Sequence, residues 1–227
     1  MKKILGYALL CSLPLIGTAQ AETTQTTEAP SKTYIGISLG STSSTYLKDE
    51  LAGLIPEHAI DTKDVGGKLF LGIRTNSPYF DAQFSLVNLG KFDVQWYEYE
   101  YLSGDSTSFD GSIKASGLFA NGLLKLPFAS NKGALYGKLG LGYAIVKQEA
   151  TGEDISGGVT TYYASQSQTD TGLGFVAGFG ISYDLGKHFG LQAEAERYFV
   201  PIKDDSNSDD TSTMKINLVT LGVYYRF

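Results

Sequence analysis

The chain has 227 residues, a formal net charge of −6 from 18 basic and 24 acidic side chains, and one cysteine. The acidic balance argues against nucleic-acid binding, which depends on basic patches facing phosphate. A lone cysteine excludes an internal disulfide, and no apolar run after the N-terminal segment approaches the ~20 residues of a membrane-spanning helix.

The N-terminal segment has the features of a secretory signal. Two lysines follow the first methionine, an apolar stretch extends to Ile16, and Ala19-Gln20-Ala21 matches a cleavage site. Cys11 lies inside this segment, so the mature chain is expected to contain no cysteine. The predicted organisation is a removed signal at residues 1–21, a flexible lead at 22–32 and one folded domain at 33–227.

Eight later segments alternate apolar side chains with small or polar ones. A period of two indicates strands with two unlike faces. The clearest segment sets six apolar residues, from Leu173 to Tyr183, against a face that is mostly glycine. The predicted strands are Thr33–Gly40, Gly67–Thr75, Tyr79–Leu86, Ser112–Leu126, Ala134–Gln148, Gly172–Tyr183, Leu191–Tyr198 and Val219–Phe227.

The connections between these strands alternate in length. Short turns follow the second, fourth and sixth strands, and bacterial outer-membrane barrels combine short periplasmic turns with long extracellular loops. The sequence therefore predicts an all-β, eight-stranded antiparallel up-and-down transmembrane β-barrel, with both termini in the periplasm. The predicted long loops are Ser41–Gly66, Asn88–Gly111, Glu149–Thr171 and Pro201–Thr213. Outward aromatic residues are expected near the short turns (Phe80, Tyr183, Tyr225, Phe227) and near the long loops (Tyr143, Phe199).

The chain ends in Tyr225-x-Phe227, which resembles the C-terminal signal of bacterial outer-membrane barrels. With the strand count and the loop asymmetry, the sequence resembles the family of small eight-stranded barrels that includes the OmpA transmembrane domain, OmpX, Ail and the opacity proteins. The resemblance implies a monomer in the outer membrane of a Gram-negative cell. It also implies contact with lipid and lipopolysaccharide, and recognition of Tyr225 and Phe227 by the barrel-assembly machinery. Its external loops would act in adhesion, surface interaction or envelope integrity.

A soluble lipocalin is an alternative with the same strand number. Such a protein would point its apolar residues into a ligand cavity and its polar residues into water. The glycine face of the sixth segment would be a poor water-facing surface but a good lining for a narrow interior. This pattern favours the membrane barrel.

Charged residues are expected to point into the barrel. They could form the path of a narrow, porin-like channel, which inward glycines would also favour. We favour mutual pairing, because an eight-stranded barrel holds little beyond its own side chains and a buried unpaired charge costs several kcal/mol. The inward charges are Lys68, Arg74, Asp81, Lys125, Lys138, Glu194, Glu196 and Arg226.

The sequence offers little for catalysis or metal binding. His58 and His188 fall at opposite ends of the predicted barrel, so no catalytic residue and no cofactor is assigned, and a lipid-modifying enzyme is a remote alternative. Within the acidic stretch 204–210, Asp205, Asn207 and Asp209 match the first three ligand positions of an EF-hand loop. Ile216 stands where the bidentate glutamate belongs, so we expect a solvated acidic loop with at most weak cation binding.

The second predicted loop is unusually aromatic. Its rings could extend the third and fourth strands beyond the membrane as a ribbon, or form a girdle among lipopolysaccharide headgroups. Tyr and Trp dominate the energetics of many interfaces. The candidate residues for binding a host or surface ligand are Trp96, Tyr97, Tyr99 and Tyr101.

Overall fold

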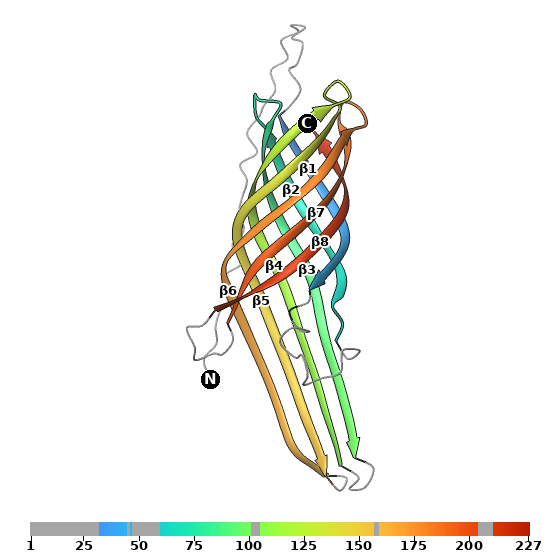
Figure 1. Cartoon of the computed structure of the whole chain (residues 1–227), viewed down its shortest axis with the longest axis vertical. Helices are drawn as coiled ribbons and strands as arrows, with labels where there is room; N and C mark the ends of the chain where they lie inside the picture. Colours follow the sequence, from blue (N-terminus) through green and yellow to red (C-terminus); the bar gives the residue numbers. More distant parts are fainter. Residues whose placement is uncertain (1–31, 45, 47–59, 101–104, 157–158, 204–210) are drawn as a thin grey trace, which may run out of the picture.

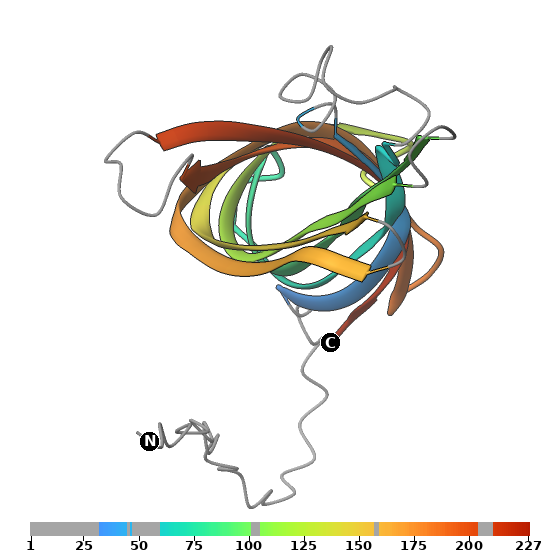
Figure 2. The same cartoon turned by 90° about the horizontal axis from the view of Figure 1, so that it is seen from below.

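A computed structural model describes residues 32–44, 46, 60–100, 105–156, 159–203 and 211–227. Each strand pairs with the next one along the chain in antiparallel fashion, and β1 pairs with β8, so the eight strands form a closed barrel (Figures 1 and 2). The predicted fold is confirmed. The strands are β1 (Thr33–Ser44), β2 (Lys63–Arg74), β3 (Phe80–Glu100), β4 (Asp105–Phe128), β5 (Gly133–Ser156), β6 (Val159–Asp184), β7 (Phe189–Lys203) and β8 (Thr211–Arg226).

The three short turns lie where the sequence predicts them, but the long loops are shorter than predicted. Most of Asn88–Gly111 and Glu149–Thr171 is strand, so predicting loops there was wrong. The alternation of apolar and polar residues ends where the strands extend beyond the apolar layer of the membrane. The backbone pairing between the strands continues past that point. The first and fourth long loops are also shorter than predicted, because β1 extends to Ser44 and β7 extends to Lys203.

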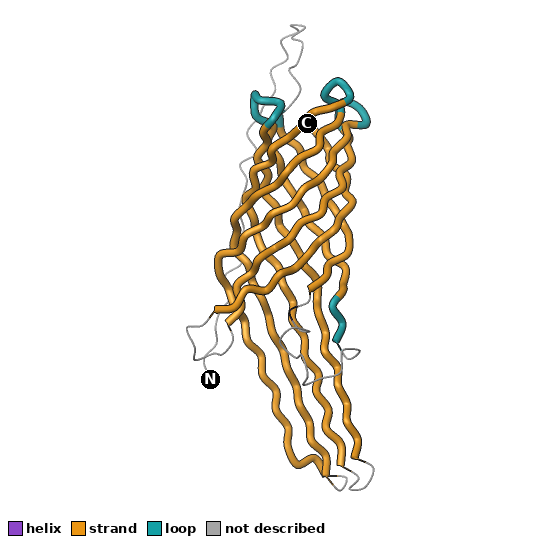
Figure 3. The backbone as a smooth tube through the Cα atoms, viewed as in Figure 1, coloured by secondary structure: helices purple, strands orange, loops and turns teal. Residues whose placement is uncertain are grey.

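Four strands therefore project beyond the rest of the barrel (Figures 1 and 3). We call this projection the protruding sheet. The nine residues of β3 in it correspond to about 30 Å of extended chain at ~3.3 Å per residue. It comprises Phe92–Glu100 of β3, Asp105–Ile113 of β4, Gln148–Ser156 of β5 and Val159–Gln168 of β6.

The outer wall of the barrel is apolar. Leu173 and Leu221 are 83% and 73% exposed, and every strand contributes similar side chains. The lipocalin alternative is thereby excluded, since a soluble barrel would bury these residues. The aromatic residues predicted to face outward near the short turns are exposed, as is Tyr143, whereas Phe199 is half-buried against Phe175. In the described part of the chain, no helix is long and apolar enough to cross a membrane.

The hydrophobic core lies inside the barrel, toward the protruding sheet. It consists mainly of side chains from β3 to β8, and we call it the apolar cluster. Its members are Val87, Leu89, Phe92, Ile113, Ala115, Phe119, Ala144, Val146, Val176, Tyr198, Val200, Ile202, Met214, Ile216 and Leu218.

A β-bulge in β3 sets which residues reach this core. Between Asn88 and Lys91, β3 has one residue more than β4 opposite it. Gly90 adopts a φ of 90° there, and its N–H donates to Asn88 Oδ1 at 3.0 Å. The extra residue reverses the alternation. Leu89 faces inward before it, and Phe92 faces inward after it.

Candidate functional site

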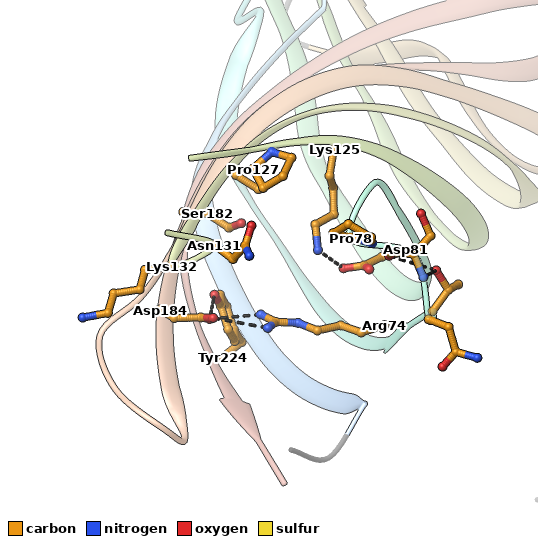
Figure 4. Close-up of a pocket in the computed structure, with 15 residues that line it drawn as sticks. Arg74, Pro78, Asp81, Lys125, Pro127, Asn131, Lys132, Ser182, Asp184 and Tyr224 are labelled. Atoms are coloured by element: carbon orange, nitrogen blue, oxygen red, sulfur yellow. Dashed lines mark hydrogen bonds and ion pairs between the residues drawn. The ribbon is translucent and has the colours of Figure 1, made fainter. Parts of the chain in front are cut away.

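The inward charges nearest the short turns form ion pairs (Figure 4). Arg74 and Arg226 both bind Asp184, with nitrogen–oxygen distances of 3.0 and 2.7 Å, and Lys125 Nζ lies 2.8 Å from Asp81 Oδ2. An open cavity of about 240 Å³ lies between the short turns, and its lining includes Arg74, Asp81, Lys125 and Asp184. Asp184 was missed in the sequence because it directly follows the last residue of the predicted sixth strand.

Farther inside, four charges form a neutral group that we call the buried quartet: Lys68, Lys138, Glu194 and Glu196. Each lysine pairs with both glutamates, and the distances to Glu196 are 2.6 Å from Lys68 and 2.8 Å from Lys138. All four side chains are at most 1% exposed. The eight charges predicted to face inward therefore all have opposite-charge partners, as mutual pairing requires.

Aromatic packing occupies the space that inward glycines leave. The Phe119 ring meets Tyr198 edge-on, with 5.0 Å between centroids. Gly117, Gly142 and Gly174 surround this ring so closely that a Cβ on each would lie 2.7, 2.5 and 3.3 Å from it. At Phe119 the ring itself therefore fills the space over these glycines. Nearer the short turns, a cavity lined by Tyr34 and Tyr136 measures about 20 Å³, which is about enough for one water molecule.

The aromatic residues of the second predicted loop lie on β3 of the protruding sheet, as the ribbon alternative predicts. Trp96 is half-buried opposite Phe109 on one face, while Tyr97 is 65% exposed on the other. Tyr99 pairs through its backbone with Ser106, and Tyr101 lies outside the described residues. The four candidates thus do not form a single patch on one face.

The two edges of the protruding sheet differ. β6 pairs with β7 from Phe175 to Asp184, and Gly172 still lies against Pro201 of β7. Farther out, within the described residues, Val159–Thr169 has no neighbouring strand on that side. This 11-residue free edge carries no charged residue and no proline. The β3 edge carries three charged residues, Asp93, Glu98 and Glu100, and is bridged at Val94 by Ile60. Sequence alone could not reveal the free edge, because it depends on where β7 ends.

A basic row crosses the outer wall where the protruding sheet begins. Lys91 pairs in register with Lys114, and Lys114 pairs with Lys147, so the three side chains share one face. Lys91 Nζ forms an ion pair with Asp93 Oδ1 at 2.7 Å. Lys114 Nζ lies 3.8 Å from Glu149 Oε2.

The remaining predicted sites are only partly described. His188 Nδ1 lies 3.1 Å from the Arg226 carbonyl oxygen, and its ring stacks on Tyr225, whereas His58 is outside the described residues. The predicted signal and the acidic stretch 204–210 are outside them as well. Among the residues that are described, no three His, Cys, Asp or Glu side chains gather as metal ligands would. Tyr225 and Phe227 contact each other and are exposed, and their recognition by assembly machinery stays a prediction.

Comparison with known proteins agrees with the architecture. The model of the outer membrane protein beta-barrel domain matches residues 8–227. Among curated protein sequences, none matches the chain.

Three solved structures illustrate the likeness in fold. The attachment invasion locus protein Ail of Yersinia pestis, solved with the heparin analogue sucrose octasulfate, is 18% identical with a TM-score of 0.45, covering 86% of this chain and 99% of Ail. Neisserial surface protein A is 16% identical with a TM-score of 0.41, covering 88% of this chain and 100% of that protein. OprG of Pseudomonas aeruginosa is 14% identical with a TM-score of 0.43, covering 87% of this chain and 97% of OprG.

Proposed function

Since this chain belongs to the outer membrane protein beta-barrel domain family, whose members reside in the bacterial outer membrane, we propose that it is a non-enzymatic surface-interaction protein. Its protruding sheet faces the cell exterior, and the free edge of β6 binds an extended segment of a partner polypeptide. The single observation that carries this proposal is the uncharged stretch Val159–Thr169, which has no neighbouring strand on its outer side within the described residues.

The orientation follows from the two ends of the barrel. In bacterial outer-membrane barrels, short turns face the periplasm and long projections face outward. Here the short turns and the end of β8 lie at one end, and the protruding sheet lies at the other (Figure 1). The sheet would then stand above the lipid surface, within reach of other cells and soluble proteins.

Backbone chemistry supports binding at β6. A sheet edge presents a row of unpaired N–H and C=O groups, and natural proteins normally protect such edges with lysine, proline or bulges. The β6 edge has neither lysine nor proline, and its one register shift lies at the tip, opposite Asp154 and Ile155, whereas the β3 edge is charged and bridged. An added strand would gain main-chain hydrogen bonds along the edge, and its alternate side chains would set specificity.

Adding charge to the free edge tests this proposal. Ser165→Lys with Ser167→Lys places two exposed lysines on β6, and we expect at least a tenfold loss of affinity for extended peptides. The refolded wild-type barrel would first select ligands from a phage-displayed library of random 12-residue peptides. Fluorescence polarisation would then compare the selected peptides on wild type and variants.

Thr151→Lys is the matched control, because Thr151 pairs with Ser165 on the same face but belongs to the interior strand β5. It should change peptide affinity less than twofold. Failure to enrich any peptide, or equal losses in both variants, would reject binding at the β6 edge.

The filled interior argues against the channel alternative. The buried quartet and the apolar cluster occupy successive levels of the barrel, and the space beside the glycines is taken by Phe119. The refolded protein should therefore give no steady openings in planar bilayers, with heat-modifiable gel mobility verifying its fold. Reproducible openings that change with Lys138→Glu would instead assign function to the lumen.

A further inference from the structure

Three lysines stand side by side on the outer wall, at the border between the apolar surface and the protruding sheet. Lys91, Lys114 and Lys147 occupy one register row across β3, β4 and β5. Like charges directly opposite one another on a sheet are destabilising. A row of three such lysines therefore requires either compensating anions in the protein or an anion from outside.

The bulge in β3 places Lys91 in this row. Below the bulge, the odd-numbered residues of β3 face inward, so Lys91 would also point inward if the alternation continued. Gly90 absorbs the extra residue, and Asp64 Oδ2 accepts a hydrogen bond of 2.5 Å from the backbone N–H of Lys91. A Cβ at Gly90 would lie 2.8 Å from Thr42 Oγ1, so the site fits glycine closely.

Carboxylates in the next row compensate the lysines only in part. Asp93 pairs with Lys91, and Glu149 lies at the outer limit of an ion pair with Lys114. For Lys147, the described residues provide no carboxylate within 4.0 Å. The Lys91 and Lys114 side chains are 44% and 49% exposed, so their ammonium groups can reach an external ligand.

A groove runs from this row along the apolar wall. It has a volume of about 680 Å³ and is lined by Lys114 and Lys147 together with outward side chains of β1, β2 and β3. Its middle contains small or polar residues, Gly67, Asn88 and Ser116, and apolar residues such as Leu69 and Leu86 form the far side. An occupant would thus meet positive charge at one end and hydrocarbon-like surface at the other.

We infer that the lysine row and this groove form a binding site for the phosphorylated headgroup and one acyl chain of lipid A, the membrane anchor of lipopolysaccharide. The inference rests on the orientation given under Proposed function, which places the row at the outer leaflet. Phosphate carries up to two negative charges and three acceptor oxygens. It therefore complements a row of ammonium groups better than a zwitterionic headgroup does, while the acyl chain occupies the apolar groove.

The test compares lipids that differ in phosphate and in acyl anchor. The refolded barrel in detergent would be titrated with diphosphoryl lipid A, dephosphorylated lipid A, phosphatidylglycerol and inorganic phosphate. Wild type should bind diphosphoryl lipid A at least tenfold more tightly than any of the other three. The triple variant Lys91→Gln, Lys114→Gln, Lys147→Gln should lose at least tenfold in that affinity.

A second triple variant controls for charge. Lys32→Gln, Lys132→Gln and Lys187→Gln remove three exposed lysines at the short-turn end, and this variant should bind lipid A within twofold of wild type. Removing the like-charge row should leave the detergent-folded barrel at least as resistant to urea as wild type, so loss of binding would not reflect misfolding.

Several outcomes would overturn the assignment. Unchanged lipid A affinity in the row variant would do so, as would equal losses in both triple variants. Equal binding of phosphatidylglycerol or inorganic phosphate would reduce the site to a general anion site and exclude lipid A as its specific occupant. Peptide binding at β6 uses other residues, so the row variant should retain it, and the two proposals can fail separately.

Discussion

Replacing Lys138 with methionine is expected to lower the free energy of unfolding by about 3–5 kcal/mol, the usual cost of leaving a buried charge without its partner. Lys138 pairs with Glu194 and Glu196, whose side chains are at most 1% exposed. The variant would leave two buried carboxylates facing one ammonium group, that of Lys68. Urea unfolding in lipid vesicles, followed by heat-modifiable gel mobility, measures the loss.

Charge balance, rather than side-chain volume, should explain that loss. The double variant Lys138→Met, Glu194→Gln keeps one lysine and one glutamate in the quartet and should recover at least ~2 kcal/mol of the loss. A single variant that loses less than ~1 kcal/mol, or a double variant that shows no recovery, would contradict this account. Tryptophan fluorescence suits this measurement poorly, because the one tryptophan, Trp96, lies in the protruding sheet.

Phe119→Ala should lower the free energy of unfolding by about 3–5 kcal/mol, as expected for removing a buried aromatic ring. The ring is fully buried, packs edge-on against Tyr198 and fills space over glycines from three strands. The three glycines have no side chains that could fill the space left by the ring. Urea unfolding in lipid vesicles, as for Lys138→Met, measures this loss of free energy.

Phe119→Leu is the matched variant, because it retains most of the apolar volume. Its cost should stay below ~1.5 kcal/mol. If both substitutions at Phe119 cost the same, edge-on aromatic contact rather than volume would be the main contribution. If neither cost more than ~1 kcal/mol, the glycine-lined space would not be a packed core.

The membrane-spanning part of the fold was predictable because lipid imposes a simple rule on each strand. Outward side chains such as Leu135 and Leu139 must be apolar, while Tyr136 and Lys138 between them face the interior. This alternation identified all eight strands, their order and eight inward charges, although it missed Asp184. The short turns were equally clear, because residues that favour turns, such as Asn76-Ser77-Pro78 and Gly186-Lys187, interrupt the pattern.

Beyond the apolar layer, that rule no longer applies, and prediction from sequence failed there. Polar side chains can occupy both faces of a strand in water, so Gln166 and Ser167 resemble loop residues although they lie in β6. The bulge at Gly90 reverses the alternation, which hid the inward position of Phe92. The lysine row and the free edge depend on register between strands, and no single segment of sequence records that register.

The seam between β1 and β8 has a consequence for how the barrel forms. It joins the two ends of the domain through 11 residue pairs, from Tyr34 opposite Arg226 to Ser44 opposite Ile216. The hairpins that build the protruding sheet pair residues close in sequence, so their loop-closure entropy is small. Sheet extension from β3 to β6 can therefore precede closure, and we expect the β1–β8 seam to be the last pairing to form.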